Sequence, residues 1–310
     1  MASSRELAAP SGLTGSRGVH LATLVVFVAF LDFFIGLPLV PTYAKDLGAS
    51  AATAGIIVAA YSVTNLPGNI AAGYFLDRFG RRLPITTGLV VTALALAGYA
   101  LANSPEALLA VRGLHGFAAA VLTPGAFAML GDSTQTHSRA RTMGRSAAGI
   151  AVAAVVGPAS AGILADRIGY EPVFLIAAAL MAATAVIYIV GSRDADAAAF
   201  VEQDGSGAGE DSTGEPFNAA GLAVASFIAL ALTIGIGTLA TYMPLHVEAL
   251  GETSRTSGSA FTLYAVTALI MMVGAIGVIG DRYGRLVLVS AGLGLFGAGL
   301  FLMALSLIHI

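Results

Sequence analysis

The sequence contains no cysteine and few charged residues, and each scarcity excludes a class of protein. Without cysteine there is no disulfide, no thiolate nucleophile and no cysteine-ligated metal. Charged residues make up 11% of the 310 residues, against about 25% in an ordinary soluble domain, whereas 57% are apolar. The chain is therefore neither an ordinary soluble enzyme, nor a nucleic-acid binder, nor a disordered chain. Its formal net charge of −3 is less informative than the positions of the charges.

Long apolar runs dominate the chain instead. A membrane-spanning helix needs about 20 predominantly apolar residues. Candidate segments of this kind cover residues 19–40, 52–76, 84–102, 106–130, 143–165, 172–191, 218–245, 257–280 and 286–308. The first is too long for a signal peptide and is therefore expected to be a transmembrane helix. The sequence predicts an all-α, polytopic membrane helix bundle.

One long polar break divides these segments into two groups. Residues 1–18 form an N-terminal polar segment, and residues 19–191 contain six segments that we expect to form one bundle. Residues 192–217 combine acidic residues with glycine and serine, a composition that predicts a disordered acidic loop without a site of its own. Residues 218–310 hold the remaining three segments, which we expect to form part of a second bundle.

The basic residues set the expected orientation, because loops rich in lysine and arginine stay in the cytoplasm. With the N-terminus inside, Lys45, Arg167 and Arg255 fall outside, and Arg112 lies within an apolar segment. All the others fall on the cytoplasmic side: Arg5, Arg17, Arg78, Arg81, Arg82, Arg139, Arg141, Arg145, Arg193, Arg282 and Arg285. We expect a multi-pass plasma-membrane protein with a cytoplasmic N-terminus.

An internal repeat relates segments 1–3 to segments 7–9. Residues Pro41, Gly48, Gly55, Tyr61, Gly73, Asp77, Arg78, Gly80 and Arg81 recur as Pro244, Gly251, Gly258, Tyr264, Gly277, Asp281, Arg282, Gly284 and Arg285. The repeated segments have the same orientation and lie six spans apart. Parallel repeats of this kind are one plan of secondary transporters, whose substrate site lies near the bilayer midplane between the two halves.

At these residues the chain resembles the major facilitator superfamily, and most of all its drug–proton antiporter branch. The turn after the second segment reads Gly73-Tyr-Phe-Leu-Asp77-Arg78-Phe-Gly80-Arg81-Arg82, which matches the family's G-x-x-x-D-R-x-G-R-R element at every defined position. Leu31-Asp32 with Leu37-Pro38 is similar to the family's motif in helix 1, and Arg112 with Gly116 is similar to its motif in helix 4. Gly149, Gly157-Pro158 and Gly162 resemble the family's signature in helix 5, although Ala161 replaces one glycine of that signature.

The repeated turn resembles a charge cluster that latches the two halves of family members together. The resemblance assigns this conformational latch to Gly73, Asp77, Arg78, Gly80, Arg81, Asp132, Gly277, Asp281, Arg282, Gly284 and Arg285. Gly73 is expected to permit close backbone approach, and Gly80 to form a tight turn. Asp281 is expected to meet its counterpart around residues 142–146. The alternative is that these arginines only fix the topology and contact acidic lipid head groups.

Asp32 and Arg112 are the charged residues well inside apolar segments. A charge at the bilayer centre costs at least ~2.5–3.5 kcal/mol, so such groups usually face a cavity or each other. Burial disfavours a charged carboxyl and a nearby guanidinium favours it, so Asp32 could take up and release a proton. The family resemblance implies the same proton-coupling role. A static pair that only joins two helices is the alternative.

His115 follows Arg112 by three residues and therefore lies on the same helical face. Imidazole titrates near neutral pH, which suits a proton relay or a substrate hydrogen bond. A neutral histidine bonded to a backbone carbonyl is equally consistent with the sequence. No second ligand at metal-binding spacing accompanies it, so no metal is expected.

Gly149, Gly157, Pro158 and Gly162 thin the fifth segment along one region. Small residues let helices pack closely, and proline allows a bend. The motif predicts a flexible contact between the halves that favours export, or else a plain packing face.

The family has twelve helices, whereas nine segments are found here. The last six residues, Leu305-Ser306-Leu307-Ile308-His309-Ile310, match the translation of a transposase mosaic-end adapter, CTG-TCT-CTT-ATA-CAC-ATC. We therefore expect the natural gene to continue past this point, with an ordinary apolar helix end as the alternative. Genomic DNA that shows different codons and a stop after Ile310 would contradict this expectation.

Together these features predict a secondary transporter that exports small, drug-like molecules in exchange for protons by alternating access. An uptake carrier for a nutrient or organic acid, and a non-transporting membrane scaffold, are the alternatives. The sequence shows no phosphate loop, nucleotide fingerprint, catalytic triad or paired carboxylates, so we expect neither an enzyme nor a cofactor. The expected partners are a small-molecule substrate, protons and the lipid bilayer, without nucleic acid, and the expected state is a monomer.

Overall fold

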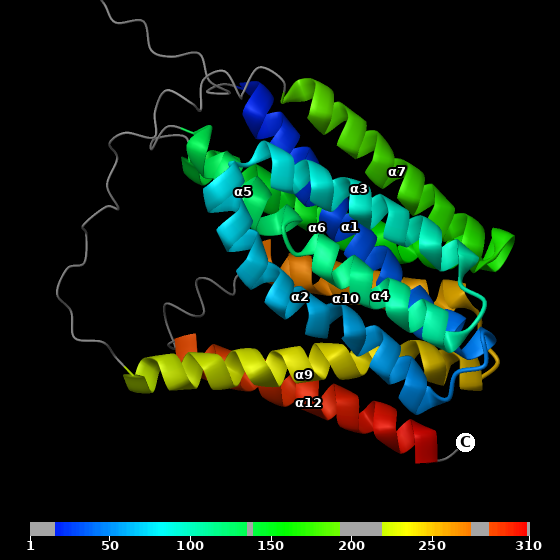
Figure 1. The fold of residues 1–310 in the computed structure, drawn as a ribbon. Helices are drawn as coiled ribbons and strands as arrows, with labels where there is room; N and C mark the ends of the chain where they lie inside the picture. The colour runs from blue at the N-terminus through cyan, green and yellow to red at the C-terminus, as the bar shows by residue number, and fades with distance from the viewer. Residues whose placement is uncertain (1–15, 135–138, 193–218, 274–284, 309–310) are drawn as a thin grey trace, which may run out of the picture.

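The computed structural model describes residues 16–134, 139–192, 219–273 and 285–308, and every regular element within these ranges is a helix. The all-α prediction is therefore confirmed. The helices in chain order, shown in Figure 1, are α1 (Ser16–Asp46), α2 (Ala51–Phe79), α3 (Arg82–Leu101), α4 (Pro105–Ala119), α5 (Leu122–Asp132), α6 (Arg139–Ile168), α7 (Tyr170–Gly191), α9 (Ala219–Ala249), α10 (Ser254–Val273) and α12 (Arg285–Ile308).

Seven stretches of the described residues are long and apolar enough to cross a membrane. They are Arg17–Asp46, Arg82–Leu101, Pro105–Asp132, Thr142–Ile168, Tyr170–Gly191, Gly221–Ala249 and Val287–Ser306. α2 and the described α10 fall outside this set, because polar residues such as Asn65, Asn69 and Ser257 dilute their apolar content. By length and apolar content, seven of the nine predicted segments therefore qualify as membrane spans.

The predicted fourth segment is divided into α4 and α5. Both helices belong to the single apolar stretch Pro105–Asp132, and the break falls at Ala120 and Val121. Pro124 explains its position, because a proline has no N–H for the carbonyl four residues earlier and its ring clashes with that carbonyl. That carbonyl belongs to Ala120. The helix resumes with a bond from the Gly125 N–H to the Val121 carbonyl at 3.0 Å.

Local sequence explains where several helices begin and end. Ser50 and Ser104 cap α2 and α4, each accepting a hydrogen bond from the backbone N–H three residues later. Pro105 occupies the first position of α4, where its missing N–H costs nothing. Gly80 ends α2 with a φ of +70°, so the expected tight turn is present before Arg81.

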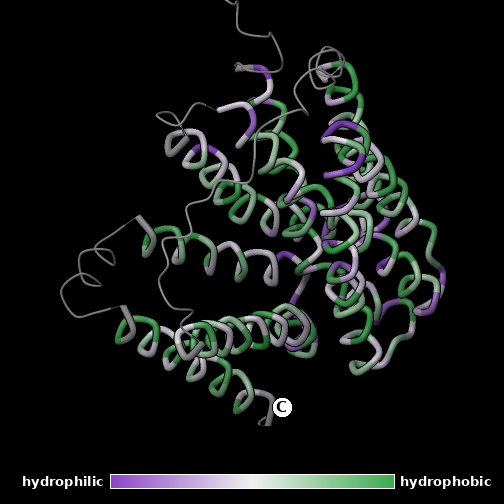
Figure 2. The backbone as a smooth tube through the Cα atoms, turned by 60° about the vertical axis from the view of Figure 1, so that its left-hand side comes forward, coloured by the Kyte–Doolittle hydropathy of each residue, from purple (hydrophilic) through white to green (hydrophobic). Residues whose placement is uncertain are grey.

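The helices α1 to α7, named here the N-terminal bundle, share one apolar core. α1 contacts α2, α5, α6 and α7, and its fully buried residues include Ala22, Val25 and Leu39. The outward faces remain apolar: Val186 of α7 and Leu94 of α3 are 59% and 65% exposed. Figure 2 shows hydrophobic residues along most of each helix and hydrophilic residues mainly towards the helix ends. Such continuous apolar surface indicates a lipid environment.

Among the C-terminal helices α9, α10 and α12, α10 lies along the N-terminal bundle, whereas α9 meets it mainly near its own C-terminal end. α10 packs along α6, and the last part of α9 packs on α1 and α2, with Ala240 and Leu245 buried. Earlier in α9, Phe227, Leu230 and Ile234 are all more than half exposed. Figure 1 accordingly shows α9 diverging from α1 towards its own N-terminal end.

Candidate functional site

The polar residues at the centre of the N-terminal bundle come from α1, α3 and α4. Asp32 of α1 is 6% exposed, and Arg112 and His115 of α4 are 5% and 1% exposed. Glycines hold the surrounding helices close together. A Cβ on Gly116 of α4 would lie 2.7 Å from the Cα of Tyr61, so only glycine fits against α2 there. In these closely packed, low-dielectric surroundings an unpaired polar group is costly, so each polar contact matters for stability.

Asp32 and His115 form a buried pair. The Nε2 atom of His115 lies 2.8 Å from Oδ2 of Asp32. On the other side of the ring, Nδ1 of His115 lies 2.8 Å from the hydroxyl of Tyr99 in α3. The imidazole therefore uses both nitrogens, one towards α1 and one towards α3. Its bond partners are side chains, not the backbone carbonyl that the sequence also allowed.

Arg112 joins the same chain of contacts through Tyr99. Its NH1 atom donates to the Tyr99 hydroxyl at 3.2 Å, and its guanidinium lies over the ring of Tyr61 at 4.7 Å from the centroid. Gly36 of α1 leaves room for it, since a Cβ there would lie 3.5 Å from NH1. Within the described part of the chain, Nε of Arg112 has no hydrogen-bond partner.

Asp32, His115, Tyr99 and Arg112 thus form one hydrogen-bonded row, named here the buried polar chain. With a neutral imidazole that carries its proton on Nε2, each of the three contacts has one donor and one acceptor: Arg112 donates to Tyr99, Tyr99 donates to His115, and His115 donates to the Asp32 carboxylate. Arg112 and Asp32 are therefore linked, but only through Tyr99 and His115. The direct partner of the carboxylate is His115, because the imidazole and the tyrosine hydroxyl stand between the two charges.

Tyr99 is the member that sequence reasoning missed. It occurs in the apolar α3 and is 1% exposed. A buried tyrosine hydroxyl almost always finds a polar partner, so a tyrosine inside an apolar segment was the available signal. Asn65 of α2 adds a further polar contact nearby, with its Nδ2 donating to the carbonyl of Gly116 at 2.9 Å.

Two residues of the predicted latch, Arg81 and Asp132, contact each other at the turn between α2 and α3. Nε of Arg81 donates to Oδ2 of Asp132 at 3.0 Å, which ties this turn to the end of α5, and NH1 of Arg81 donates to the Leu76 carbonyl at 3.2 Å. Asp77 and Arg78 are exposed. The guanidinium of Arg78 lies 5.8 Å from the centroid of the Phe79 ring.

Other members of the predicted latch are differently placed or lie elsewhere. A Cβ on Gly73 would meet no atom within 4 Å in the described part of the chain, so the expected close backbone approach is not found there. The face of α2 that carries Gly73 is exposed among the described residues, so a close approach at Gly73 stays a prediction. Gly277, Asp281, Arg282 and Gly284 lie outside the described residues, and α12 begins at Arg285.

The glycines of α6 lie at two helix contacts. A Cβ on Gly157 would lie 2.8 Å from Cβ of Phe34, so this glycine brings α6 close to α1 beside the buried polar chain. Gly162 faces Gly258 of α10, and a Cβ on Gly162 would lie 3.1 Å from the Cα of that residue. Pro158 is accommodated within α6, whereas Gly149 makes a looser contact with Phe27. The motif therefore supplies the close contact between the N-terminal bundle and α10.

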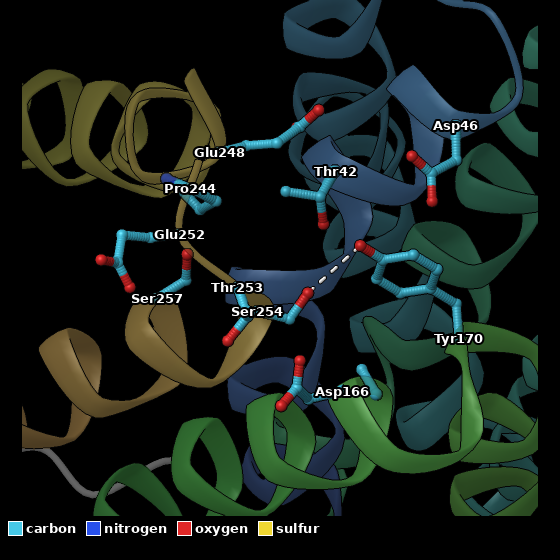
Figure 3. Close-up of a pocket in the computed structure, with 11 residues that line it drawn as sticks. Thr42, Asp46, Asp166, Tyr170, Pro244, Glu248, Glu252, Thr253, Ser254 and Ser257 are labelled. Carbon is cyan, nitrogen blue, oxygen red and sulfur yellow. Dashed lines mark hydrogen bonds between the residues drawn. The ribbon is translucent and has the colours of Figure 1, made fainter. Parts of the chain in front are cut away.

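A second polar region lies where α1, α6 and α7 meet α9 and α10. A cavity of about 270 Å³ lies here, and its lining includes the carboxyl-bearing residues Asp46, Asp166, Glu248 and Glu252, which are labelled in Figure 3. The hydroxyl groups of Tyr170 and Ser254 lie 3.1 Å apart across it. The lining therefore comes from both the N-terminal bundle and the C-terminal helices. We name it the acidic cavity.

An ion pair joins α1 to α9 beside the acidic cavity. Nζ of Lys45 lies 3.1 Å from Oε1 of Glu248, and both side chains are a little over one-third exposed. Exposed pairs of this kind contribute ~0–1 kcal/mol, so this contact can break readily. Across the described ranges, no group of three or more His, Cys, Asp or Glu side chains is arranged to hold a metal ion.

The comparisons with known proteins agree with this architecture. A bacterial homolog of the human lysosomal transporter Spinster, in an inward-facing and unoccupied conformation, matches with a TM-score of 0.68 at 18% identity, over 89% of this chain and 64% of that chain. The inward-facing, occupied form of that homolog matches with a TM-score of 0.67 at 19% identity, over 86% of this chain and 62% of that chain.

Among curated proteins, Multidrug resistance protein 1 of Bacillus subtilis is 31% identical over 169 residues, which is 54% of this chain and 43% of that protein. Quinolone resistance protein NorA of Staphylococcus aureus is 27% identical over the same share of each chain. The chain thus matches less than half the length of these relatives. The description "Major Facilitator Superfamily" fits residues 22–309, nearly the whole sequence. The chain is a multi-pass membrane protein that belongs to the Major Facilitator Superfamily.

Proposed function

We propose that this transporter exports small apolar or cationic molecules in exchange for protons by alternating access. Members of its family move small molecules across membranes, often together with a proton. The observation that carries the proposal is the Asp32–His115 contact at 2.8 Å, because it places two titratable groups in the membrane-embedded part of the bundle. An intramembrane ionisable pair is expensive to bury and usually belongs to a substrate or proton pathway.

The buried polar chain suits proton exchange because its protonation state controls its bonding. With Asp32 ionised, the carboxylate accepts the Nε2 proton of His115, and the relay through Tyr99 balances the charge of Arg112. A proton on Asp32 removes that negative charge and weakens the bond to His115, since charge-assisted bonds are about twice as strong as neutral ones. Uptake of one proton therefore loosens the contact between α1 and α4.

The packing of α9 and α10 supports a carrier that opens on one side. Two polar contacts of these helices with the N-terminal bundle lie at the acidic cavity, where Lys45 meets Glu248 and Tyr170 meets Ser254. A third joins the Thr262 hydroxyl of α10 to the Val155 carbonyl of α6. The opposite end of α9 is exposed. With the cytoplasmic N-terminus that we propose from the arginine distribution, the closed end faces outwards and the open end faces the cytoplasm. The Arg81–Asp132 pair then lies on the cytoplasmic side, where a latch would act.

Efflux is supported by the names of the relatives. Two of them are named for resistance, one to multiple drugs and one to quinolones. A membrane transporter confers resistance when it lowers the internal concentration of a compound, which requires export. Alternating access driven by a proton gradient supplies the energy without a nucleotide, and the chain then needs no cofactor.

The test is proton-driven transport by an Asp32→Asn variant of the gene as it stands in the genome, expressed in an efflux-deficient bacterial strain. Resistance to cationic dyes and quinolones is measured with and without an uncoupler. We expect the variant to lose resistance and substrate-induced proton release while it keeps its membrane level, because asparagine preserves the shape but cannot ionise. Glu106→Gln is the matched control, since Glu106 lies exposed in the first turn of α4.

Undiminished gradient-driven export by Asp32→Asn would refute the role of the buried pair in proton coupling. Cells in which the parent protein raises the internal level of a compound, in a manner abolished by the uncoupler, would instead identify an uptake carrier. If the parent protein still confers resistance in the presence of the uncoupler, the proton gradient does not drive its transport.

A further inference from the structure

The lateral face of the N-terminal bundle carries an apolar groove that the transport mechanism does not use. It lies between α2 and α3 with α4 as its floor, and its volume is about 520 Å³. Figure 1 shows α4 between α2 and α3 in this part of the bundle. The lining includes Phe75 and Phe79 of α2, Leu83 of α3 and Leu114 of α4, each between 44% and 54% exposed.

The floor of this groove is closed by direct helix contacts. A Cβ on Gly68 would lie 2.7 Å from Cβ of Ala120, and a Cβ on Gly88 would lie 2.9 Å from Cδ2 of Leu122. The polar lining residue Thr87 donates its hydroxyl to the carbonyls of Leu83 and Pro84, at 3.0 and 2.9 Å. An occupant therefore meets an apolar surface and cannot pass through it to the buried polar chain.

The length of the groove matches one leaflet of a bilayer. Along α2 it runs from Phe79, at the turn into α3, back to Gly68. The eleven steps between these two residues, at a rise of 1.5 Å each, span about 16.5 Å. Half of a hydrocarbon core of about 30 Å is about 15 Å. The groove thus starts at the membrane surface and ends near the midplane, which is the depth reached by one acyl chain.

A positive charge stands at the mouth of the groove. The guanidinium of Arg78 lies 5.8 Å from the centroid of Phe79, a residue that lines the groove. Arg82 begins α3 directly before the lining residue Leu83. Asp77 is the exposed acidic neighbour, and Arg81 is engaged with Asp132. Among the described residues at this turn, positive charge is therefore in excess, and a guanidinium binds phosphate through two parallel N–H bonds.

From these features we propose that the groove binds an anionic phospholipid of the leaflet at the α2–α3 turn. One acyl chain lies between α2 and α3, and the phosphate of the head group contacts Arg78. The apolar lining selects the chain, whereas the arginine selects an anionic head group over a zwitterionic one. Near an anionic membrane each basic residue favours such lipids by a factor of about five.

The experiment uses the absence of tryptophan from the chain, because one introduced indole then reports a single place. Phe75→Trp puts the reporter in the groove, four residues before the end of α2. Ile187→Trp puts the control on the exposed face of α7, also four residues before the helix end. Both full chains are reconstituted into phosphatidylcholine vesicles with a small fraction of phosphatidylglycerol that carries brominated acyl chains. Bromine quenches an indole that it touches.

We expect the local fraction of phosphatidylglycerol at position 75 to exceed its bulk mole fraction about fivefold, and the fraction at position 187 to equal it. Arg78→Gln should remove the excess, and Arg78→Lys should restore part of it. Brominated phosphatidylcholine should give no excess at either reporter. Ala71→Leu, which fills the groove without a change in charge, should also abolish the excess.

Four outcomes would overturn the proposal. Equal quenching at positions 75 and 187 would mean that the groove holds no preferred lipid. An excess that survives Arg78→Gln would place the selectivity elsewhere. An equal excess of brominated phosphatidylcholine would show a site for acyl chains of any lipid. Lack of quenching at position 75 by either lipid would show that protein, such as a second copy of the chain, covers the groove.

Discussion

Replacing Tyr99 by phenylalanine removes one hydroxyl from the buried polar chain and leaves the ring in place. The hydroxyl oxygen lies 3.2 Å from NH1 of Arg112 and 2.8 Å from Nδ1 of His115. The ring packs edge to face on Phe174, with centroids 4.9 Å apart, and phenylalanine keeps that contact. Any effect of Tyr99→Phe therefore reports the two hydrogen bonds.

The expected loss of stability follows from those two bonds. Interhelical hydrogen bonds in a membrane protein contribute ~0.6 kcal/mol each on average, so two contribute about 1.2 kcal/mol. The arginine increases the loss, because a buried donor left without its acceptor costs ~1–3 kcal/mol, and a charged donor costs more. Nε of Arg112 already lacks a partner among the described residues. We expect Tyr99→Phe to lower the free energy of unfolding by about 1–3 kcal/mol, or roughly 5- to 150-fold in the equilibrium.

The assay is unfolding in mixed micelles of dodecyl maltoside and dodecyl sulfate, followed by circular dichroism. Tyr43→Phe is the matched control, because the Tyr43 hydroxyl is also buried but donates to the backbone carbonyls of Tyr99 and Ala102. It should cost about 1 kcal/mol or less. His115→Ala in both backgrounds completes a double-mutant cycle, in which contacting residues should show a coupling of ~0.5–3 kcal/mol.

A Tyr99→Phe variant as stable as the parent would refute this reasoning. So would a loss no larger than that of Tyr43→Phe together with zero coupling to His115→Ala. Either result would mean that the hydroxyl does not hold Arg112 and His115 in their places, and the buried polar chain would then be a set of separate contacts.

Three further predictions follow from the helix contacts. Gly116→Ala should destabilise the fold by ~1–3 kcal/mol through overpacking against α2, whereas Gly113→Ala on the same helix, with its nearest contact at 3.5 Å, should not. Gly162→Leu should separate α6 from α10 and lower transport, which a dye-efflux assay measures. Cysteines at Lys45 and Glu248, joined by a short bifunctional reagent, should stop transport in this otherwise cysteine-free chain.

Each of these predictions has a control on the same element. Gly144→Leu tests α6 without its contact to α10, because a Cβ there meets nothing within 4 Å in the described part of the chain. A Gly162→Leu protein that transports as well as Gly144→Leu would contradict the need for close packing. Equal stability of Gly116→Ala and Gly113→Ala would contradict the overpacking argument. Transport that continues after cross-linking would show that the contact at Lys45 need not open.

The helices were largely predictable, because apolar runs of the required length stand out against polar connectors. The fourth segment shows the limit of that signal. Hydropathy is continuous from Pro105 to Asp132, so a sliding average reports one span. The break at Ala120 depends on one missing N–H at Pro124, which hydropathy does not measure. The sequence did contain the proline, but tertiary context decides whether such a residue bends a helix or breaks it.

The sequence indicated three of the four members of the buried polar chain, but not the hydrogen bonds that connect them. Asp32, Arg112 and His115 were recognisable as polar residues in apolar segments. Their pairing depends on the height of α4 relative to α1 and α3, which close contacts such as that of Gly98 in α3 with Val111 in α4 help to set. Such distances arise from packing in three dimensions and leave no periodic pattern in the sequence.

The break between α4 and α5 divides one membrane crossing into two helices that can move separately. The α4 piece carries Arg112 and His115 in the interior, and the α5 piece carries Asp132 at the surface. A continuous rod would pass every tilt at one end to the other end undiminished. A crossing with a joint at Ala120 can instead move its surface charge while its interior groups keep their alignment, so in the proposed mechanism opening of the latch and proton transfer need not be simultaneous.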